Sequence, residues 1–250
     1  PANRKHSKFR PDPDVDPMFT AHNEDYWKSG WSRGHMAPAG DNKFSQEAMN
    51  DTFLLSNIVP QNLDNNAGFW NRFEMYCRDL ASRFEDVYVL SGPLYLPTQD
   101  GQQKVVKYPV IGGSEVAVPT HLYKVVVAER FNTPTSIAAF VVPNQRIGYQ
   151  NLTDFQVPIK DLEKSAGFSI YPQLDRSKTK NLCELDSCKL LGKNEFELYF
   201  IGRKLQSART LERAEKVWKE LEEKNLKPDQ YLVDLYAKKK EELSAKPSEE

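Results

Sequence analysis

A short segment of the chain combines a cation with a titratable imidazole, a pairing that can support acid–base chemistry on a phosphate. Arg33 and His35 are two residues apart, so in an extended backbone their side chains share one face. Gly34 between them permits close approach of another backbone or of a ligand phosphate. Histidine is well suited to accept a proton near neutral pH. An isolated histidine is more often structural, so this segment alone does not establish a catalytic site.

A second group of polar side chains follows further along the chain, at Asn57, Gln61, Asn65 and Asn66. Trp70, Glu74 and Arg78 come next at helical spacing, so they line one stripe of a helix with Asn66 just before its first turn. An asparagine carbonyl and a carboxylate suit Mg²⁺, which keeps most of its waters and needs few protein ligands. The spacing also fits a surface ion pair between Glu74 and Arg78, with Asn66 as a helix cap, and both interpretations stay open.

Composition excludes several classes of protein. The 250 residues are 39% hydrophobic and 28% charged, which is enough apolar material for a buried core and argues against a disordered chain. The formal net charge is −1, so any polyanion site must be a local patch rather than an overall basic surface. No apolar run is long enough to span a membrane, and no signal sequence is recognisable. Because the chain begins with proline, we expect that a targeting segment was lost with a missing end.

Cysteine usage favours a reducing compartment. Cys77, Cys183 and Cys188 form neither an even framework nor two close metal-binding pairs. The sequence therefore suggests neither a disulfide scaffold nor a structural zinc site.

The predicted order of elements begins with an extended arm over residues 1–25, because its prolines prevent a regular helix. Its cations could contact phosphate or could simply be solvated: Arg4, Lys5, His6, Lys8 and Arg10. A short helix capped by Ser45 is expected at 44–50, a strand at 52–58 and a loop at 61–66. Apolar residues at spacings of three and four predict a helix from Phe69 to Phe84.

The period then changes to that of strands. Four strands are predicted at 87–90, 105–111, 122–128 and 137–142, pairing as a largely antiparallel sheet. A turn and short helix at 154–166, ended by Gly167, and a strand at 196–201 complete the core. Two amphipathic helices follow, around 211–221 and 231–236, and the run 238–250 is expected to be a frayed helix end. The predicted division is a core over 1–200 and a C-terminal helical domain over 201–250.

The chain resembles the non-specific DNA/RNA nuclease family with a ββα-metal active site. The residues that carry this resemblance, in order, are Arg33, Gly34, His35, Asn57, Pro60, Gln61, Asn66, Trp70 and Glu74. Further stretches and the helical tail resemble its mitochondrial exo/endonuclease G branch. The resemblance implies an α+β fold: a ββα-metal nuclease core with a central antiparallel sheet flanked by helices, plus a C-terminal helical hairpin.

The resemblance also implies a role for each site residue. The histidine matching His35 takes a proton from water, and the asparagine matching Asn66 is the one direct protein ligand of Mg²⁺, for which Mn²⁺ could substitute. The glutamate matching Glu74 holds metal-bound waters. Arg33 and Arg78 would contact phosphate oxygens, and Asn57 would orient the site. Nucleic-acid contacts are expected from Arg4, Lys43 and Arg209.

The implied function is Mg²⁺-dependent hydrolysis of DNA, 5′ to 3′ from duplex or single-stranded ends, with some endonuclease activity. The alternatives are an endonuclease of DNA and RNA like endonuclease G, or a non-catalytic nucleic-acid-binding module. RNA and RNA/DNA junctions are further candidate substrates. The resemblance implies a homodimer in mitochondria, at the inner membrane or in the intermembrane space, with full-length protein anchored by a segment absent here.

Three features stay open. Many relatives carry aspartate where this chain has Ser32, so charge support of the histidine differs. The family has an N-terminal strand region ahead of the arm, so we expect a truncated core or a part supplied by another chain. Tail cations could hold phosphate or could be surface charges paired with Glu212 and Glu215: Lys204, Arg209, Arg213 and Lys216.

Overall fold

The computed structural model describes residues 1–245, so the last five residues of the predicted frayed end lie outside the described part. The chain forms two compact units, Pro1–Leu190 and Leu191–Glu250. The expected boundary at 200 falls inside a continuous helix, α7 (Lys193–Ser207), which belongs entirely to the second unit.

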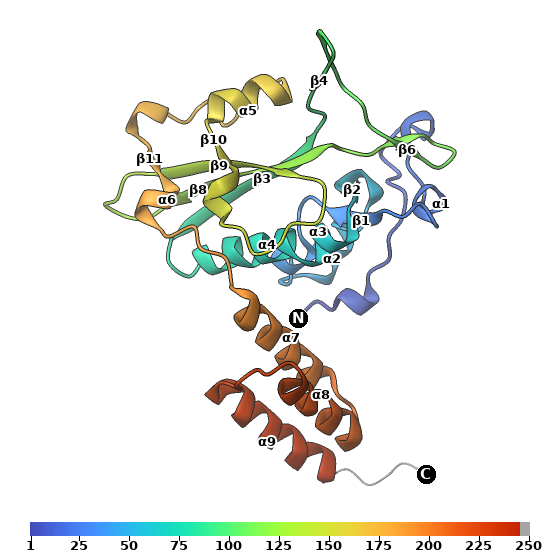
Figure 1. The fold of residues 1–250 in the computed structure, drawn as a ribbon, viewed down its shortest axis with the longest axis vertical. Helices are drawn as coiled ribbons and strands as arrows, with labels where there is room; N and C mark the ends of the chain where they lie inside the picture. Colours follow the sequence, from blue (N-terminus) through green and yellow to red (C-terminus); the bar gives the residue numbers. More distant parts are fainter. Residues whose placement is uncertain (246–250) are drawn as a thin grey trace. The chain divides into compact units, whose positions relative to one another are not determined.

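A five-stranded sheet forms the centre of the first unit (Figure 1). Its path runs from β10 (Gln156–Val157) through β9 (Ser136–Pro143) and β8 (His121–Glu129) to β3 (Asp86–Leu94), all antiparallel neighbours. β11 (Lys180–Asn181) adds a short parallel pairing to β9. The predicted antiparallel sheet is confirmed. Successive residues of a strand point to opposite faces of the sheet, and apolar side chains of these strands lie on both faces.

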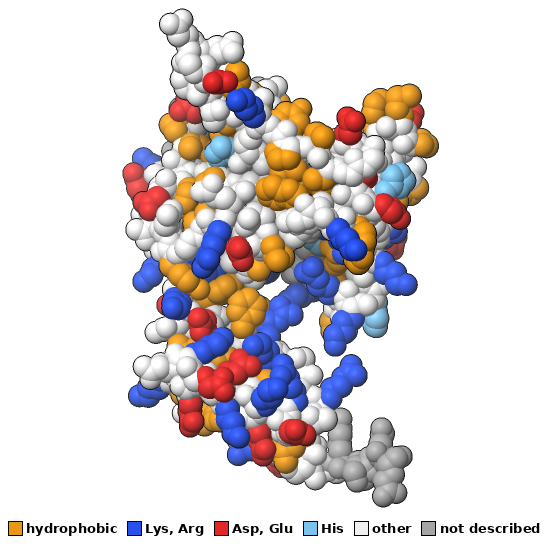
Figure 2. All heavy atoms as spheres, turned by 45° about the vertical axis from the view of Figure 1, so that its right-hand side comes forward, with side chains coloured by type: hydrophobic (Ala, Val, Ile, Leu, Met, Phe, Trp, Pro, Cys, Tyr) orange, Lys and Arg blue, Asp and Glu red, His pale blue; other side chains and the backbone are white. Residues whose placement is uncertain are grey.

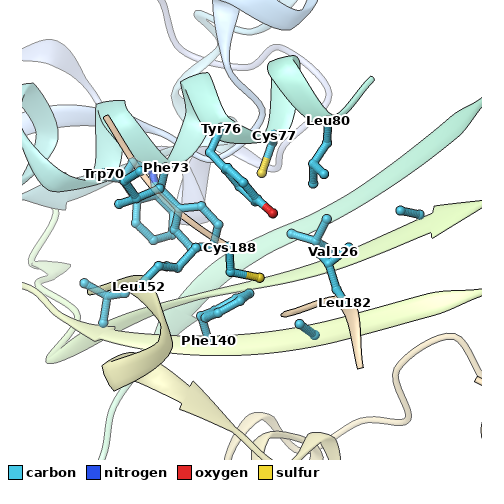
Figure 3. Close-up of a cluster of buried hydrophobic side chains, with 14 of the residues drawn as sticks. Trp70, Phe73, Tyr76, Cys77, Leu80, Val126, Phe140, Leu152, Leu182 and Cys188 are labelled. Carbon is cyan, nitrogen blue, oxygen red and sulfur yellow. The ribbon is translucent and has the colours of Figure 1, made fainter. Parts of the chain in front are cut away.

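Helices cover both faces of this sheet (Figure 1). On one face α4 (Phe69–Leu80) buries the helical stripe predicted from the sequence, with Trp70, Phe73 and Leu80 directed at the sheet (Figure 3). On the other face α5 (Ile159–Ala166) packs through Leu162 and ends at Gly167, whose φ of 84° is the left-handed cap expected there. The α+β fold is confirmed.

A separate two-stranded antiparallel sheet also belongs to the first unit. β1 (Ser32–His35) pairs antiparallel with β2 (Ile58–Gln61), and α3 (Leu63–Ala67) then leads into α4. The predicted strand at 52–58 is wrong, because its end turns through the 3-10 helix η4 (Leu55–Asn57) and β2 begins only at Ile58. The predicted loop at 61–66 is also mostly helix, since Asn62 caps α3 by accepting the backbone N–H of Asn65.

Short elements fill the remaining connections of the first unit. Ser45 caps α2 (Gln46–Asp51), as predicted, and α1 (Asn23–Tyr26) and α6 (Leu182–Leu185) are single turns. The strand predicted at 105–111 is wrong, because Pro109 interrupts it and its ends join two separate hairpins. These pair β4 (Thr98–Asp100) with β5 (Gln103–Val105), and β6 (Val110–Ile111) with β7 (Val116–Ala117). The other 3-10 turns are η1 (Arg4–His6), η2 (Pro17–Phe19), η3 (Ala39–Asp41), η5 (Leu152–Phe155) and η6 (Arg176–Lys178).

A disulfide joins Cys183 to Cys188, so the expectation of no disulfide is wrong. Cys77 is the odd cysteine and lies buried as a free thiol. The bridge closes a short loop in which Asp186 accepts hydrogen bonds from the Tyr76 hydroxyl and the Arg83 guanidinium. A count of three cysteines could not reveal a local pair of this kind.

The second unit is helical. The two predicted helices are confirmed as α8 (Leu211–Glu223) and α9 (Gln230–Ser244), whereas the strand predicted at 196–201 is wrong and lies within α7. Leu205, Val217 and Leu232 form its small core, and Trp218 stacks on Tyr236 with ring centroids 4.3 Å apart. On the face that Figure 2 shows, Lys and Arg side chains of this unit lie among Asp and Glu side chains. Within residues 1–245, every helix is too short or too polar to cross a bilayer.

Truncating a buried aromatic side chain of the core should lower the free energy of unfolding far more than truncating an exposed one. Phe140 is completely buried in the layer between the sheet and α4, 5.1 Å from the Phe73 ring, so Phe140→Ala should lower the free energy of unfolding by about 3–5 kcal/mol. Phe131→Ala is the matched control, because Phe131 is 83% exposed, and should change it by less than about 0.5 kcal/mol. Urea unfolding measures both, and equal effects would contradict this packing.

Candidate active site

Strand β1 of the two-stranded sheet places Arg33 and His35 on one face, as the spacing predicts. Both contact Phe9 of the N-terminal arm: the Arg33 guanidinium lies 3.9 Å from the ring centroid and the His35 ring centroid lies 5.5 Å from it. Gly34 points the other way, where a Cβ atom would collide with the side chain of Gln61. This glycine therefore makes room for a protein side chain, and not for a phosphate as the sequence suggested.

His35 is only 7% exposed, and its Nε2 is a buried atom with no hydrogen-bond partner among the described residues. Burial lowers the pKa of the imidazole to about 4, and the positive charges of Arg4 and Arg33 act in the same direction. The ring is therefore neutral at physiological pH. A neutral imidazole with a free nitrogen can accept a proton.

Asn66 lies in α3, and its amide orientation follows from its neighbours. The Ser32 hydroxyl donates its single proton to the carbonyl of Gln61, at 2.8 Å, so it can only accept from Asn66. The Asn66 Nδ2 group donates to that hydroxyl at 3.3 Å. The carbonyl oxygen of Asn66 is then left without a hydrogen-bond donor in residues 1–245. Ser32 thus supplies an acceptor at the position where many relatives have aspartate.

A buried amide network holds α3 against the end of β9. Asn65 is fully buried, accepts from the Gln61 side chain at 2.7 Å and donates to the carbonyl of Gln145 at 3.0 Å. Asn144 accepts from the backbone N–H of Asn62 at 2.9 Å and donates to the carbonyl of Pro60. The sequence singled out Gln61 and Asn65 as polar residues but gave no signal for Asn144, whose partners are distant in the chain.

Glu74 projects from α4 and is half-buried. Its carboxylate makes no hydrogen bond or ion pair within the described residues. Burial raises its pKa to about 7, although the positive charges of Lys124 and Arg78 partly oppose this effect. The buried Lys124 lies under the helix, with its Nζ 4.5 Å from the Trp70 ring centroid. The predicted stripe therefore runs from a fully buried Trp70 out to Arg78.

Arg78 does not form the surface ion pair with Glu74 that the sequence left open. Its guanidinium instead donates to the Asp41 carboxylate at 3.0 Å. It also packs over Gly40, where an added Cβ would crowd the guanidinium. Asp41 is thus a further charged residue at this site that the sequence reading missed, because the Asp41–Arg78 contact joins two distant segments.

The remaining predicted residues divide into two groups. Arg4 lies near the site: its guanidinium is 5.3 Å from the Phe53 ring centroid, and its charge acts on both His35 and Glu74, so these two groups face a common cation. Asn57 uses its side chain to bond both backbone groups of Ala37, at 2.9 and 3.0 Å, which fixes the chain just after His35. Lys43 and Arg209 are exposed, and Arg209 belongs to the second unit.

The donor set fits a hard divalent cation. No group of three or more His, Cys, Asp or Glu side chains that could hold a metal occurs in the described part of the chain. The Asn66 carbonyl and the Glu74 carboxylate both offer oxygen, and neither has a hydrogen-bond or ion-pair partner within residues 1–245. Mg²⁺ uses few protein ligands and retains waters, so this sparse set suits it better than zinc or calcium.

The electrostatics of His35 predict its titration. NMR of the imidazole should give a midpoint near pH 4, assigned with a His35→Gln variant, and a midpoint near 6.5 would contradict the burial described here. The folded-state pKa lies below the unfolded value of 6.5, so stability from the buried neutral ring is complete above pH 6.5. It is lost as the pH falls from 6.5 towards 4.

Comparisons with known proteins match two parts of this chain to described families. Residues 1–177 match the family described as DNA/RNA non-specific endonuclease, and residues 191–239 match the endo/exonuclease (EXOG) C-terminal domain. The chain is 56% identical over 251 residues to "Nuclease EXOG, mitochondrial" of Homo sapiens, covering 98% of this chain and 68% of that protein. It is 45% identical over 195 residues to "Nuclease 1, mitochondrial" of Schizosaccharomyces pombe, covering 75% of this chain and 61% of that protein.

A solved structure shares the fold. The chain in the crystal structure of the EndoG/EndoGI complex matches with a TM-score of 0.70 and 39% sequence identity, over 72% of this chain and 75% of that chain. Nucleases of the matched family are metal-dependent, and the relatives named here are mitochondrial. The chain therefore belongs to the DNA/RNA non-specific endonuclease family and is a mitochondrial nuclease with the EXOG-type C-terminal domain.

Proposed function

We propose that this nuclease hydrolyses DNA phosphodiester bonds with Mg²⁺, for which Mn²⁺ can substitute, and that His35 is the general base. The observation that carries the proposal is that His35, Asn66 and Glu74 each present an unpaired polar group, and that the charge of Arg4 acts on both His35 and Glu74. Within residues 1–245 the buried Nε2 of His35 lacks a hydrogen bond, and the part-buried Asn66 carbonyl and Glu74 carboxylate have no hydrogen-bond or ion-pair partner. Buried polar groups are rarely left unpaired without a functional reason.

The residues divide the work of hydrolysis. His35 accepts the proton of the attacking water, because it is neutral and one of its nitrogens is free. Asn66 would hold the cation directly and Glu74 would hold its water ligands. Bound Mg²⁺ would stabilise the charge on the leaving oxygen. Asn57 orients the chain after His35 through its two bonds to Ala37.

Two arginines are placed to neutralise phosphate oxygens. Asn23 accepts a hydrogen bond from the Arg33 guanidinium at 2.8 Å, and Phe9 lies under the same group, so this cation is fixed beside His35. The Arg78 guanidinium forms an ion pair with the Asp41 carboxylate, with nitrogen and oxygen 3.0 Å apart. An arginine held in place before substrate arrives loses less conformational entropy on binding phosphate.

The preferred substrate is a DNA end, cut 5′ to 3′, with some endonuclease activity. The match of residues 191–239 to the EXOG C-terminal domain supports this choice over a plain endonuclease. In the second unit Lys204 pairs with Glu220 at 2.9 Å, whereas Arg209, Arg213 and Lys216 make no ion pair within residues 1–245. These three cations, with Arg4 and Lys43, are the proposed phosphate contacts.

We further propose a homodimer at the inner membrane or in the intermembrane space of mitochondria, anchored by a segment outside this chain. RNA and RNA/DNA junctions are secondary substrates. The likeness to the EndoG chain favours broad endonuclease action on DNA and RNA as the second candidate function. A non-catalytic nucleic-acid module is disfavoured by the retained His35, Asn66 and Glu74.

A substrate panel tests the function. His35→Ala should lower turnover by about 10²–10⁴-fold, because general base catalysis is lost, while DNA binding persists. The protein is incubated with 5′-labelled duplex, circular DNA and RNA, with Mg²⁺ or a chelator. Cleavage of linear ends but not of circles supports the exonuclease. Equal cleavage of circles and RNA supports the second candidate, and full activity of the variant removes His35 from the mechanism.

Ser32 provides a test of metal positioning. Ser32→Ala removes the acceptor that directs the Asn66 amide, so the Mg²⁺ concentration for half-maximal activity should rise by about 10-fold. Ser82→Ala is the control, because that hydroxyl bonds only its own helix end at the carbonyl of Asp79. Activity measured over a Mg²⁺ titration gives the concentration for half-maximal activity of each variant. An unchanged midpoint in Ser32→Ala would show that Asn66 does not depend on this contact.

A further inference from the structure

We propose that the N-terminal arm completes the active site: Phe9 of the arm and Phe53 together hold the His35 imidazole in its catalytic orientation and shield its packed faces from bulk solvent. The inference rests on the proposed role of His35 as base. Phe9 and Phe53 are positioning residues in this account, since neither has a group that could react with a phosphate.

Three aromatic rings contact one another at this point. Phe53 meets the imidazole edge to face with centroids 4.6 Å apart and an interplanar angle of 85°, and Phe9 meets it at 5.5 Å and 61°. Phe9 and Phe53 also contact each other at 4.7 Å and 62°. Because Nε2 has no hydrogen-bond partner in residues 1–245, ring packing must help to set the orientation of the imidazole.

The arm is attached to the same segment that carries Phe53. The backbone N–H of Arg10 donates to the carbonyl of Phe53 at 3.2 Å, and Leu55 returns a hydrogen bond to the carbonyl of Arg10 at 2.9 Å. Nearer the start of the chain, Asn3 and Gln46 exchange two hydrogen bonds at 2.7 and 3.1 Å. The position of Phe9 between these two attachments is therefore specified by the fold.

Each of the two phenylalanines also contacts a guanidinium. Arg33 lies 3.9 Å from the Phe9 centroid and Arg4 lies 5.3 Å from the Phe53 centroid. These are the charged groups that face His35, from the arm and from its own strand, and no carboxylate forms an ion pair with it in the described residues. Removal of Phe9 would therefore admit water to the imidazole and release Arg33 from its stacked position.

A purely structural role for Phe9 predicts a different outcome. Phe9 is only partly buried and packs against the small cluster of Ala39, Met49 and Phe53, so a packing defect there would lower stability. Such a defect would reduce the folded fraction without changing the pH dependence of the molecules that remain folded. The pH profile therefore separates a positioning role from a structural one.

The test compares Phe9→Ala and Phe9→Leu with Phe19→Ala in the full chain. Phe19 lies on the same arm, is 74% exposed and takes no part in the site, so it is the matched control. Initial rates on 5′-labelled duplex with Mg²⁺ give kcat, KM and the pH dependence of kcat/KM, and thermal unfolding reports the folded fraction. His35→Ala is assayed in parallel.

Phe9→Ala should lower kcat by about 10- to 100-fold, with KM changed less than about threefold, because the base is misplaced rather than substrate binding lost. The acidic limb of its kcat/KM profile should move upward towards pH 6.5, the value of a solvated imidazole. Phe9→Leu, which keeps apolar bulk, should recover most of the loss, and Phe19→Ala should match the unmodified chain.

An unchanged kcat in folded Phe9→Ala, or a loss with an unmoved pH profile, would overturn the inference. Failure of the proposed function is distinguishable from this. If His35→Ala keeps its activity, His35 is not the base and the proposed function fails. If His35→Ala is inactive while Phe9→Ala is normal, the general base stands and only the role of the arm is wrong.

Discussion

The burial of one neutral imidazole is the physical constraint on which the site depends. His35 is buried, its Nε2 has no hydrogen-bond partner in the described residues, and two cations lie close to it, so the protonated form is strongly disfavoured. Keeping such a ring in place requires packing on more than one side. The arm, β1 and the segment around Phe53 supply that packing. This explains why the short two-stranded sheet, which lies outside the main sheet, makes so many long-range contacts.

The central sheet contributes indirectly, by fixing α4. Trp70 and Phe73 are buried against the sheet (Figure 3). The register of the helix therefore sets where Glu74 and Arg78 emerge. The amide network of Asn65 and Asn144 then fixes the preceding helix, and with it Asn66, against the end of β9. A rigid core thus holds Asn66 and Glu74, the proposed metal-binding side chains, while β1 and the arm hold His35, the proposed base. This division agrees with the general need to place reacting groups on well-supported elements.

Sequence reasoning succeeded where periodicity or a local motif carried the information. The apolar stripe of α4 and the nearly continuous apolar runs of β8 and β9 were visible because each pattern extends over several residues. It failed where composition was a poor guide to local structure. The Asn62 cap begins the helix α3 within a polar stretch that was predicted to be a loop. The apolar run Phe196–Ile201, predicted to be a strand, lies inside α7. Phe9, Ser32 and Asn144 act through contacts between distant segments, which spacing alone does not encode.

In the proposed mechanism, one imidazole and one asparagine-bound cation act on the same phosphate. A crystal structure of His35→Ala with Mn²⁺ and a DNA duplex tests it most directly, because Mn²⁺ can be located by anomalous scattering and the variant leaves the substrate uncut. The account predicts Mn²⁺ at about 2 Å from the Asn66 carbonyl oxygen, Glu74 joined to it through water, and a phosphate between the ion and residue 35. A cation bound elsewhere, or a phosphate remote from residue 35, would contradict it.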